Sequence, residues 1–229
     1  MSVVPQEEYP DRVARTRALM REKRVDGLIV TDPVSFYYYT GIKIPSWQKG
    51  RPSIFVLPLE GEPALVSWSG PGMFARLYGK PFPSWVADRR IYPEAPMVHE
   101  EPCDWGLVGV LNDRKLGAAR LAIEMGDGCR LAMPLGDFRL IERTFPQATF
   151  VDSSSIIWSC RIIKSAWEQS CSRKAVEIGG RAWKRGIAEL RPGITGRDIQ
   201  ARILRYYIEE GADIEELHRM RVATRRMRS

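Results

Sequence analysis

Hydrophobic and polar residues follow two different periods along the first 151 residues. Short apolar runs bounded by turn residues predict strands at 27–30, 53–57, 63–68, 89–92, 120–125 and 148–151. Apolar residues three or four positions apart predict helices at 9–23, 34–39, 73–78, 104–112 and 135–145. Strands that alternate with helices in this way indicate an α/β domain with a mixed sheet.

Turn residues set several of these boundaries. Glu60-Gly61-Glu62 separates two strand-like runs and predicts a β-hairpin. Gly41 follows three consecutive tyrosines, Tyr37 to Tyr39, and is a suitable C-cap for the helix that contains them. We expect these tyrosines to pack in the core or at an interface.

The pattern changes after the last predicted strand. The run that begins at Asp152 predicts a polar turn, and Arg161 to Ser165 then lead into a long helix over 165–190. We interpret this stretch as a hinge between a complete first domain and the beginning of a second one.

Two helices are predicted beyond this hinge. Arg191-Pro192-Gly193 ends the first of them, and Thr195 with Asp198 three residues later resembles a capping box. That box opens a second helix over 196–210. Two helices of this size cannot bury all their apolar faces against each other, so we expect them to need a sheet that this chain does not supply.

The composition is typical of a soluble globular protein. Of the 229 residues, 44% are hydrophobic and 28% are charged, which argues against disorder along the whole chain. No apolar run approaches the roughly 18 to 20 residues that a membrane-spanning helix needs. The N-terminus lacks the pattern of a secretory signal. We therefore expect a cytoplasmic protein.

The net charge of +7 does not by itself indicate nucleic-acid binding. The rest of the chain shows no basic stripe interleaved with aromatic residues, so we expect neither a specific nucleic-acid partner nor a membrane partner. Five of the positive charges belong to a short C-terminal stretch, which could contact polyanions without specificity: Arg219, Arg221, Arg225, Arg226 and Arg228.

Residues that could bind a metal are few and dispersed. His99 and His218 lie far apart in the sequence. Asp213, Glu215 and Glu216 precede His218, but arginines that would repel a cation follow it, so a solvated helix end is the better interpretation. No cysteine pair has the short spacing of a zinc site. We expect four reduced thiols: Cys103, Cys129, Cys160 and Cys171.

Four stretches resemble the creatinase/prolidase/Xaa-Pro aminopeptidase family. In order, they are VDGLIVTDPVSFYYYTG, LAIEMG, FVDSSSIIWSCRIIKSAWE and LRPGITGRDIQARILRYYIEEGAD. The sharpest matches are the Arg-x-x-Lys-Ser step of Arg161, Lys164 and Ser165, and the run Pro192 to Thr195. Each motif alone is weak, but their order and spacing resemble the family up to Asp213.

The resemblance implies a specific architecture. Residues 1–158 would form a creatinase-type N-terminal domain, an α/β fold with a mixed β-sheet flanked by helices. Residues 159–213 would be the linker and the first two helices of an incomplete pita-bread (α+β) catalytic domain. Residues 214–229 would be a disordered basic tail, and their arginine-rich composition is typical of a shifted reading frame.

The resemblance also implies the chemistry of complete relatives. Prolidases and Xaa-Pro aminopeptidases bind two divalent metal ions (Mn, Co, Zn or Fe) that activate a water for attack on an amide, whereas creatinase works without metal. The family's ligands, two aspartates, a histidine and two glutamates, lie after the second helix of the pita-bread domain. We therefore expect no catalytic residue, no bound metal and no activity from this chain alone. Glu124 falls in the N-terminal domain, where the family has no metal ligand.

Family members further imply a homodimer, in which the N-terminal domain helps to cover the active site of the neighbouring subunit. The loop that would contribute side chains to that cleft holds Trp47, Lys49 and Arg51 here. A flat aromatic ring can cover a small substrate, and a cation can pair with a substrate carboxylate. The alternative is a surface loop anchored by an ordinary tryptophan.

Three functions remain open at this point. The chain could be a truncated homologue of the Xaa-Pro peptidases, whose complete relatives hydrolyse an amide bond. Within the same family it could instead resemble ectoine hydrolase or creatinase, which act on small molecules. It could also be a non-catalytic binding or dimerisation module. Nothing in the residues identifies the substrate or the metal.

Overall fold

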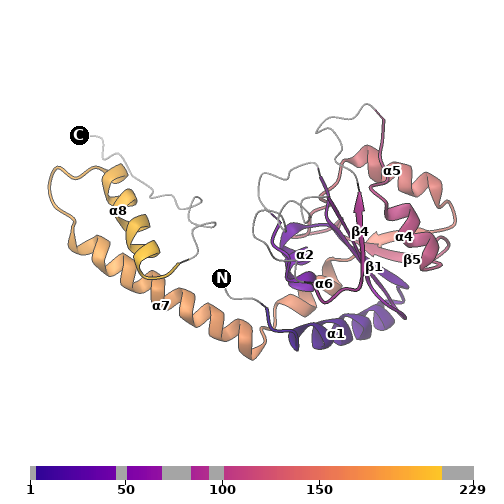
Figure 1. Cartoon of the computed structure of the whole chain (residues 1–229), viewed down its shortest axis with the longest axis horizontal. Coiled ribbons are helices and arrows are strands. Elements are labelled where there is room, and N and C mark those ends of the chain that lie inside the picture. The colour runs from indigo at the N-terminus through magenta and orange to yellow at the C-terminus, as the bar shows by residue number, and fades with distance from the viewer. Residues whose placement is uncertain (1–3, 45–50, 69–83, 93–100, 213–229) are drawn as a thin grey trace. The chain divides into compact units, whose positions relative to one another are not determined.

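A six-stranded mixed sheet organises the first 163 residues (Figure 1). The protein is seen in a computed structural model that describes residues 4–44, 51–68, 84–92 and 101–212. These residues fall into two compact units, one up to Ile163 and one from Lys164. Several predicted features lie outside the described residues: the helix at 73–78, Trp47, Lys49, His99 and everything after residue 212.

The strands are ordered β4–β3–β2–β1–β5–β6 across the sheet. β1 is antiparallel to β2 and β2 to β3, whereas β1–β5, β5–β6 and β3–β4 are parallel. Ile29 in β1 lies opposite Val56 of β2 and Ile123 of β5. The mixed sheet and the hairpin around Gly61 are therefore confirmed. The bounds are β1 Gly27–Val30, β2 Ile54–Pro58, β3 Ala64–Trp68, β4 Asp88–Tyr92, β5 Arg120–Ile123 and β6 Thr149–Asp152.

Helices cover the sheet on both faces. One core lies between the sheet and α1, α2 and α6, and a second core lies between the sheet and α4 and α5. Successive strand residues alternate between these cores, so Leu28 and Val30 join the first while Ile29 joins the second. The helix bounds are α1 Glu8–Lys23, α2 Pro33–Thr40, α4 Leu107–Asp113, α5 Leu135–Thr144 and α6 Ser154–Arg161.

The stretch after β6 is a helix, so the predicted polar turn was wrong. Ile156 and Cys160 of α6 are buried in the first core. The Asp152 carboxylate accepts hydrogen bonds from the Ser154 backbone N–H (3.1 Å) and hydroxyl (2.8 Å). The serines that suggested a turn thus begin a helix, because an acidic side chain satisfies its first donors. Residue 158, the boundary expected for the first domain, lies inside α6.

The helix predicted at 104–112 begins later than expected. Trp105 and Gly106 have left-handed backbone angles (φ 54° and 79°), so the regular helix starts at Leu107. Trp105 is a fully buried core residue whose indole N–H donates to the Asp137 carboxylate (2.6 Å). Trp105 therefore lies in the core, as an apolar residue would, but before the helix that was predicted to contain it.

The second unit consists of α7 (Ala166–Ala188) and α8 (Gly196–Glu209). Each begins with a capping box, in which Ser165 or Thr195 pairs with the acidic residue three positions later. The box at Thr195 was predicted and is confirmed. Within the described parts of the chain, no helix combines the length and apolar character needed to cross a membrane.

The two helices of this unit meet along one face of α7. Ile178, Ala182 and Gly186 are buried there, and a Cβ on Gly186 would lie only 2.4 Å from Ile203 Cγ1 of α8. Glycine therefore allows a close helix crossing. Another face of α7 carries large apolar side chains that remain exposed, Val176, Trp183 and Ile187, and Leu190 just after the helix is exposed as well.

Candidate functional site

Aromatic side chains fix α2, which precedes the loop with the candidate substrate-contact residues. Tyr39 stacks on Phe55 of β2 with ring centroids 5.3 Å apart, and its carbonyl accepts a hydrogen bond from Trp85 Nε1 (2.8 Å). Tyr9 of α1 stacks on Trp85 at 5.5 Å. Tyr38 and Tyr39 are buried, so these two tyrosines have the core packing expected of them.

Gly41 ends α2 at a point where only glycine fits. Its φ is 70°, in the left-handed region, and a Cβ there would lie 2.1 Å from the Tyr9 hydroxyl oxygen. The predicted C-cap is confirmed. Burial raises the pKa of Tyr9 to about 12, so this phenol is neutral where it touches the backbone turn.

Of the three candidate substrate-contact residues, the described structure contains Arg51. Arg51 is half-buried just before β2, and its charge lowers the pKa of Tyr92 against the larger raising effect of burial. The Tyr92 hydroxyl donates to the Pro52 carbonyl (2.8 Å). These contacts anchor the end of the loop to β4. Trp47 and Lys49 lie outside the described residues, so their role stays a prediction.

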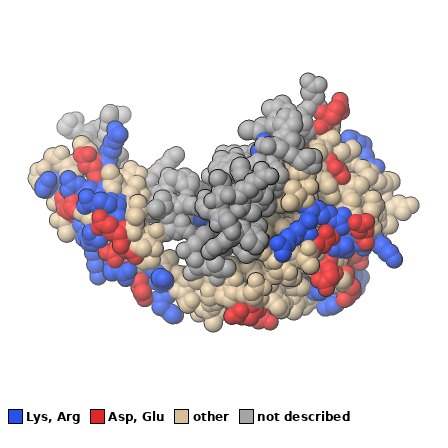
Figure 2. All heavy atoms as spheres, in the orientation of Figure 1, with Lys and Arg blue, Asp and Glu red and all other residues tan. Residues whose placement is uncertain are grey.

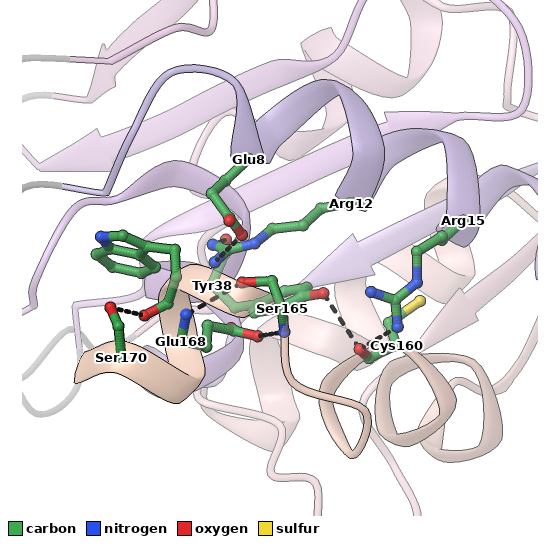
Figure 3. A network of polar contacts seen from close by, with 9 residues as sticks. Glu8, Arg12, Arg15, Tyr38, Cys160, Ser165, Glu168 and Ser170 are labelled. Carbon is green, nitrogen blue, oxygen red and sulfur yellow. Dashed lines mark hydrogen bonds and ion pairs between the residues drawn. The ribbon is translucent and has the colours of Figure 1, made fainter. Parts of the chain in front are cut away.

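A buried arginine joins α1 to α2 (Figure 3). Arg12 is only 3% exposed; its guanidinium donates to the Tyr38 carbonyl (2.6 Å) and pairs with Glu8 (3.1 Å). The guanidinium carbon also lies 4.3 Å from the centre of the Tyr38 ring. Sequence reasoning missed this residue. The available signal was its spacing: Arg12 lies four residues before the buried Thr16, so both side chains lie on the same face of α1.

The end of α6 is held in the same region (Figure 3). The Cys160 carbonyl accepts hydrogen bonds from Arg15 (2.7 Å) and from the Tyr38 hydroxyl (3.2 Å). The Cys160 thiol lies 3.3 Å from the Thr16 hydroxyl oxygen and is fully buried. A thiol in this setting packs the joint between helices and is not an accessible nucleophile.

The Arg-x-x-Lys-Ser motif contains two helix-end contacts. Arg161, at the end of α6, lies 5.0 Å from the centre of the Trp158 ring and donates to the Ser35 hydroxyl (3.3 Å). Ser165 caps α7: its hydroxyl accepts from the Glu168 N–H (3.1 Å), and its own N–H donates to the Glu168 carboxylate (2.9 Å). These contacts set the ends of two helices and do not form a reactive centre.

Glu124 is a fully buried carboxyl at the end of β5. Its Oε2 accepts hydrogen bonds from the backbone N–H groups of Thr31 and Asp32, both at 2.6 Å. Burial raises the pKa of Glu124 to about 7, although these two N–H groups act in the opposite direction. Sequence reasoning placed Glu124 at a strand end but gave it no partner.

No metal centre can be built from the described residues. Within the described ranges, no group of three or more His, Cys, Asp or Glu residues is arranged to hold an ion. These residues therefore do not fit the two-metal site that the family resemblance implies.

On the face shown in Figure 2, basic and acidic side chains are interspersed on both units. Ion pairs join such side chains in the sheet unit: Asp88 pairs with Arg90 and Arg114 at 2.9 and 2.6 Å.

Comparison with known families and proteins identifies the first unit. Residues 12–163 match the family described as the Creatinase/Prolidase N-terminal domain. The chain is 28% identical over 209 residues to the ectoine hydrolase of Halomonas elongata, covering 89% of this chain and 49% of the relative. It is 25% identical over 199 residues to an uncharacterized hydrolase/peptidase of Sinorhizobium fredii, covering 86% and 48%. The chain spans about half the length of these curated relatives.

Solved structures share the fold. A prolidase from Thermococcus sibiricus superposes with a TM-score of 0.68 at 22% identity, covering 89% of this chain and 50% of that one. The dipeptidase PepE of Mycobacterium ulcerans gives 0.65 at 21% identity, covering 92% and 52%. The two structures cover 89% and 92% of this chain, which is more than residues 12–163 represent. The structural similarity therefore extends into the unit of α7 and α8. Since the family match covers more than half of the chain, the protein belongs to the creatinase/prolidase family through its N-terminal domain.

Proposed function

We propose that this chain supplies the N-terminal domain and the first catalytic-domain helices of an amide hydrolase of the creatinase/prolidase family. The observation that supports this is the continuous likeness to hydrolases, which runs from the sheet unit into α7 and α8. The similar proteins include an ectoine hydrolase, and the similar structures include a prolidase. We therefore propose either a small-molecule amide or an Xaa-Pro peptide as the substrate class.

In this proposal the described residues form scaffold rather than reacting groups. Two divalent ions would activate a water in complete members of the family, but the described part of this chain offers no ligand cluster for them. We propose that the 229-residue chain does not hydrolyse substrate by itself. The exposed apolar stripe on α7 would pack against the remaining sheet of a complete catalytic domain.

We further propose that the loop before β2 acts across a homodimer. Trp47, Lys49 and Arg51 would reach the substrate cleft of the neighbouring subunit, where the ring covers the substrate and a cation pairs with its carboxylate. The hydrogen bond from the Tyr92 hydroxyl to the Pro52 carbonyl, next to Arg51, supports a fixed end for this loop. Sedimentation analysis of the purified chain should show a dimer, and a strict monomer at micromolar concentration would contradict this part.

The activity proposal is tested with the purified 229-residue chain. It is incubated with Mn²⁺ or Co²⁺ and with either an Xaa-Pro dipeptide or ectoine, and a complete prolidase serves as the positive control. We expect no turnover above the metal-only blank. Metal-dependent turnover that EDTA abolishes would contradict the proposal.

The exposed stripe on α7 also favours a second candidate, a non-catalytic binding module. Trp183 and Ile187 lie four positions apart on one side of α7 and are 41% and 57% exposed, and Leu190 just after the helix is 56% exposed. Apolar surface of this kind marks interaction sites. A Trp183→Asp/Ile187→Asp variant that loses self-association or partner capture while the sheet unit stays folded would support this candidate.

A further inference from the structure

The two oxygens of the Glu124 carboxyl are bound very differently. Oε2 accepts short hydrogen bonds from the N–H groups of Thr31 and Asp32, and the Thr31 hydroxyl lies 3.5 Å away. Oε1 is buried and has no hydrogen-bond partner among the described residues. The Ser35 hydroxyl also lowers the pKa of Glu124, by less than the two backbone N–H groups do. Because Oε2 already accepts two short hydrogen bonds, a proton on the carboxyl would sit on Oε1.

Glu124 connects parts of the chain that are distant in sequence. It lies at the end of β5, and the two N–H groups that it binds lie 93 and 92 positions away, where β1 leads into α2. Asp32 is the N-cap of α2, and its side chain accepts from Val34. The Glu124 carboxyl therefore fixes the start of α2 relative to the parallel strands β1 and β5.

Charged and titratable groups face this carboxyl from each neighbouring element, but none forms an ion pair with it in the described structure. After burial, the charge of the Asp32 carboxylate at the start of α2 adds a smaller raising effect on the pKa of Glu124, and this carboxylate lies 3.8 Å from Arg130 of the loop after β5. The Cys129 thiol of the same loop has its pKa raised by burial, with further effects from the charges of Glu124, Asp152 and Arg161. Arg161 of α6 donates to the Ser35 hydroxyl (3.3 Å). No cation in the described structure compensates a charge on Glu124 directly.

We propose that Glu124 is a proton-controlled latch on the junction of β1 and α2. In the neutral form, Oε2 accepts the two backbone N–H groups as a carbonyl oxygen and the proton resides on Oε1. In the ionised form, Oε2 still accepts the two hydrogen bonds, but the carboxylate places an unpaired negative charge in the core. Local opening then becomes more favourable, because it lets water reach and solvate this charge. The junction is therefore tighter in the neutral form than in the ionised form.

The direction of the pH effect follows from the raised pKa. The pKa of Glu124 is about 7 in the folded chain, against an ordinary value of 4.5. The stabilisation that the neutral carboxyl gives to the folded chain is fully present below about pH 4.5, and it is lost as the pH rises through about 7. The opening equilibrium should rise by about two orders of magnitude across this window, because each unit of pKa difference corresponds to about tenfold.

A consequence for the substrate loop rests on the proposed function. α2 carries Tyr39 and ends at Gly41, and the segment after Gly41 leads to Arg51. Loosening the start of α2 at neutral pH would therefore act on the helix that precedes this segment. The tests of the latch itself measure stability and ionisation, so they can fail or succeed independently of any hydrolase activity.

The latch is tested with Glu124→Gln, which mimics the neutral carboxyl and can donate from the Oε1 position. At pH 5 the variant and the native chain should unfold at similar temperatures. At pH 8 the variant should unfold roughly 5–10 °C higher, because only the native chain carries the buried charge. The matched control is Glu62→Gln at an exposed carboxyl, which should show no such pH-dependent difference. A Glu124→Gln difference that is constant from pH 5 to 8, or that reverses, would overturn the latch.

A direct titration removes any dependence on the folding of the variant. Carbon-13 NMR of glutamate carboxyl groups in the native chain should show one resonance that titrates near pH 7, and this resonance should be absent from the Glu124→Gln spectrum. If the Glu124 resonance titrates below about pH 5, as ordinary glutamates do, the latch is excluded.

Discussion

The two units of this chain bury their apolar residues to very different extents. In the sheet unit, Ile29 and Val56 lie in the centre of the sheet and have no exposed surface, since helices cover both faces. In the helical unit, Trp183 and Ile187 are 41% and 57% exposed, although they belong to the apolar pattern of α7 just as Ile178 does. In the sheet unit, the sheet and the helices on its two faces bury one another's apolar surfaces. In a pair of helices, only the two faces that meet are buried.

This difference shows that α7 has two apolar faces. α8 covers the first face through the close crossing at Gly186. The second face is exposed among the described residues, and in our proposal the sheet of a catalytic domain would cover it. The stability of the sheet unit should therefore be intrinsic, while that of the helical unit should depend on what it binds. The following substitutions test this comparison.

The largest contrast is expected between Phe55→Ala and Ile187→Ala. Phe55 is fully buried and stacks on Tyr39, so its removal should reduce the free energy of unfolding of the sheet unit by about 3–5 kcal/mol. Ile187 is exposed, and its removal should change stability by less than about 0.5 kcal/mol. Urea unfolding followed by circular dichroism measures both. A large loss from Ile187→Ala would mean that the second face of α7 is already covered.

Gly41→Ala should cost about 2–4 kcal/mol in the sheet unit. The new Cβ meets the Tyr9 hydroxyl and the backbone keeps a left-handed φ, so overpacking adds to strain. Gly61→Ala is the control, since its φ is 95° but nothing lies within 4 Å of its Cβ. It should cost only the strain, about 1–2 kcal/mol. Equal losses at the two positions would show that contact with Tyr9 contributes nothing.

Gly186→Ala and Gly180→Ala should act in opposite directions on the helical unit. The Cβ at Gly186 collides with Ile203, which should push α8 away and lower the melting temperature of this unit by an amount equivalent to about 1–2 kcal/mol. The Cβ at Gly180 meets nothing within 4 Å, so alanine should stabilise α7 by about 0.5–1 kcal/mol. Helical circular dichroism during thermal unfolding measures both. If Gly186→Ala also stabilises, the close crossing is not maintained in solution.

Thr195→Ala should give the smallest loss among the substitutions that are expected to destabilise the protein by a measurable amount, about 1 kcal/mol in the stability of α8. The Thr195 hydroxyl accepts the Asp198 N–H (3.1 Å), and alanine cannot replace it. Thr195→Ser is the matched control because it keeps the oxygen. Amide hydrogen exchange at the start of α8 should rise in the alanine variant and stay near the native value in the serine variant. Equal exchange in the two variants would show that the Thr195 hydroxyl does not stabilise the start of α8.

The elements that could be predicted are those whose signals are local. The hairpin around Gly61, the C-cap at Gly41 and the capping box at Thr195 each depend on residues within a few positions of one another, and all three are confirmed. α6 was missed because its serines are equally suited to a turn and to a helix start. Its burial against α1 depends on Arg15, which is 145 positions from Cys160.

The functional features also divide into those with a signal in neighbouring residues and those that depend on contacts between distant segments. Ordered motifs such as Arg161 to Ser165 pointed to the family, and the comparisons confirm it. The environment of Glu124 could not be foreseen, because its pKa depends on burial and on donors from the start of α2. The buried role of Arg12 likewise depends on α2 lying beside α1.

The sequence alone determined most of the strands and helices, because period, caps and turns depend on neighbouring positions, whereas α6 and the start of α4 were not predicted correctly. It also determined the family, because several motifs in a fixed order carry more information than any one of them. The tertiary structure alone decided which charges are buried, which apolar face of α7 stays exposed, and that the Glu124 carboxyl holds the start of α2. Burial and long-range hydrogen bonds depend on contacts between distant segments, and those contacts exist only in the folded chain.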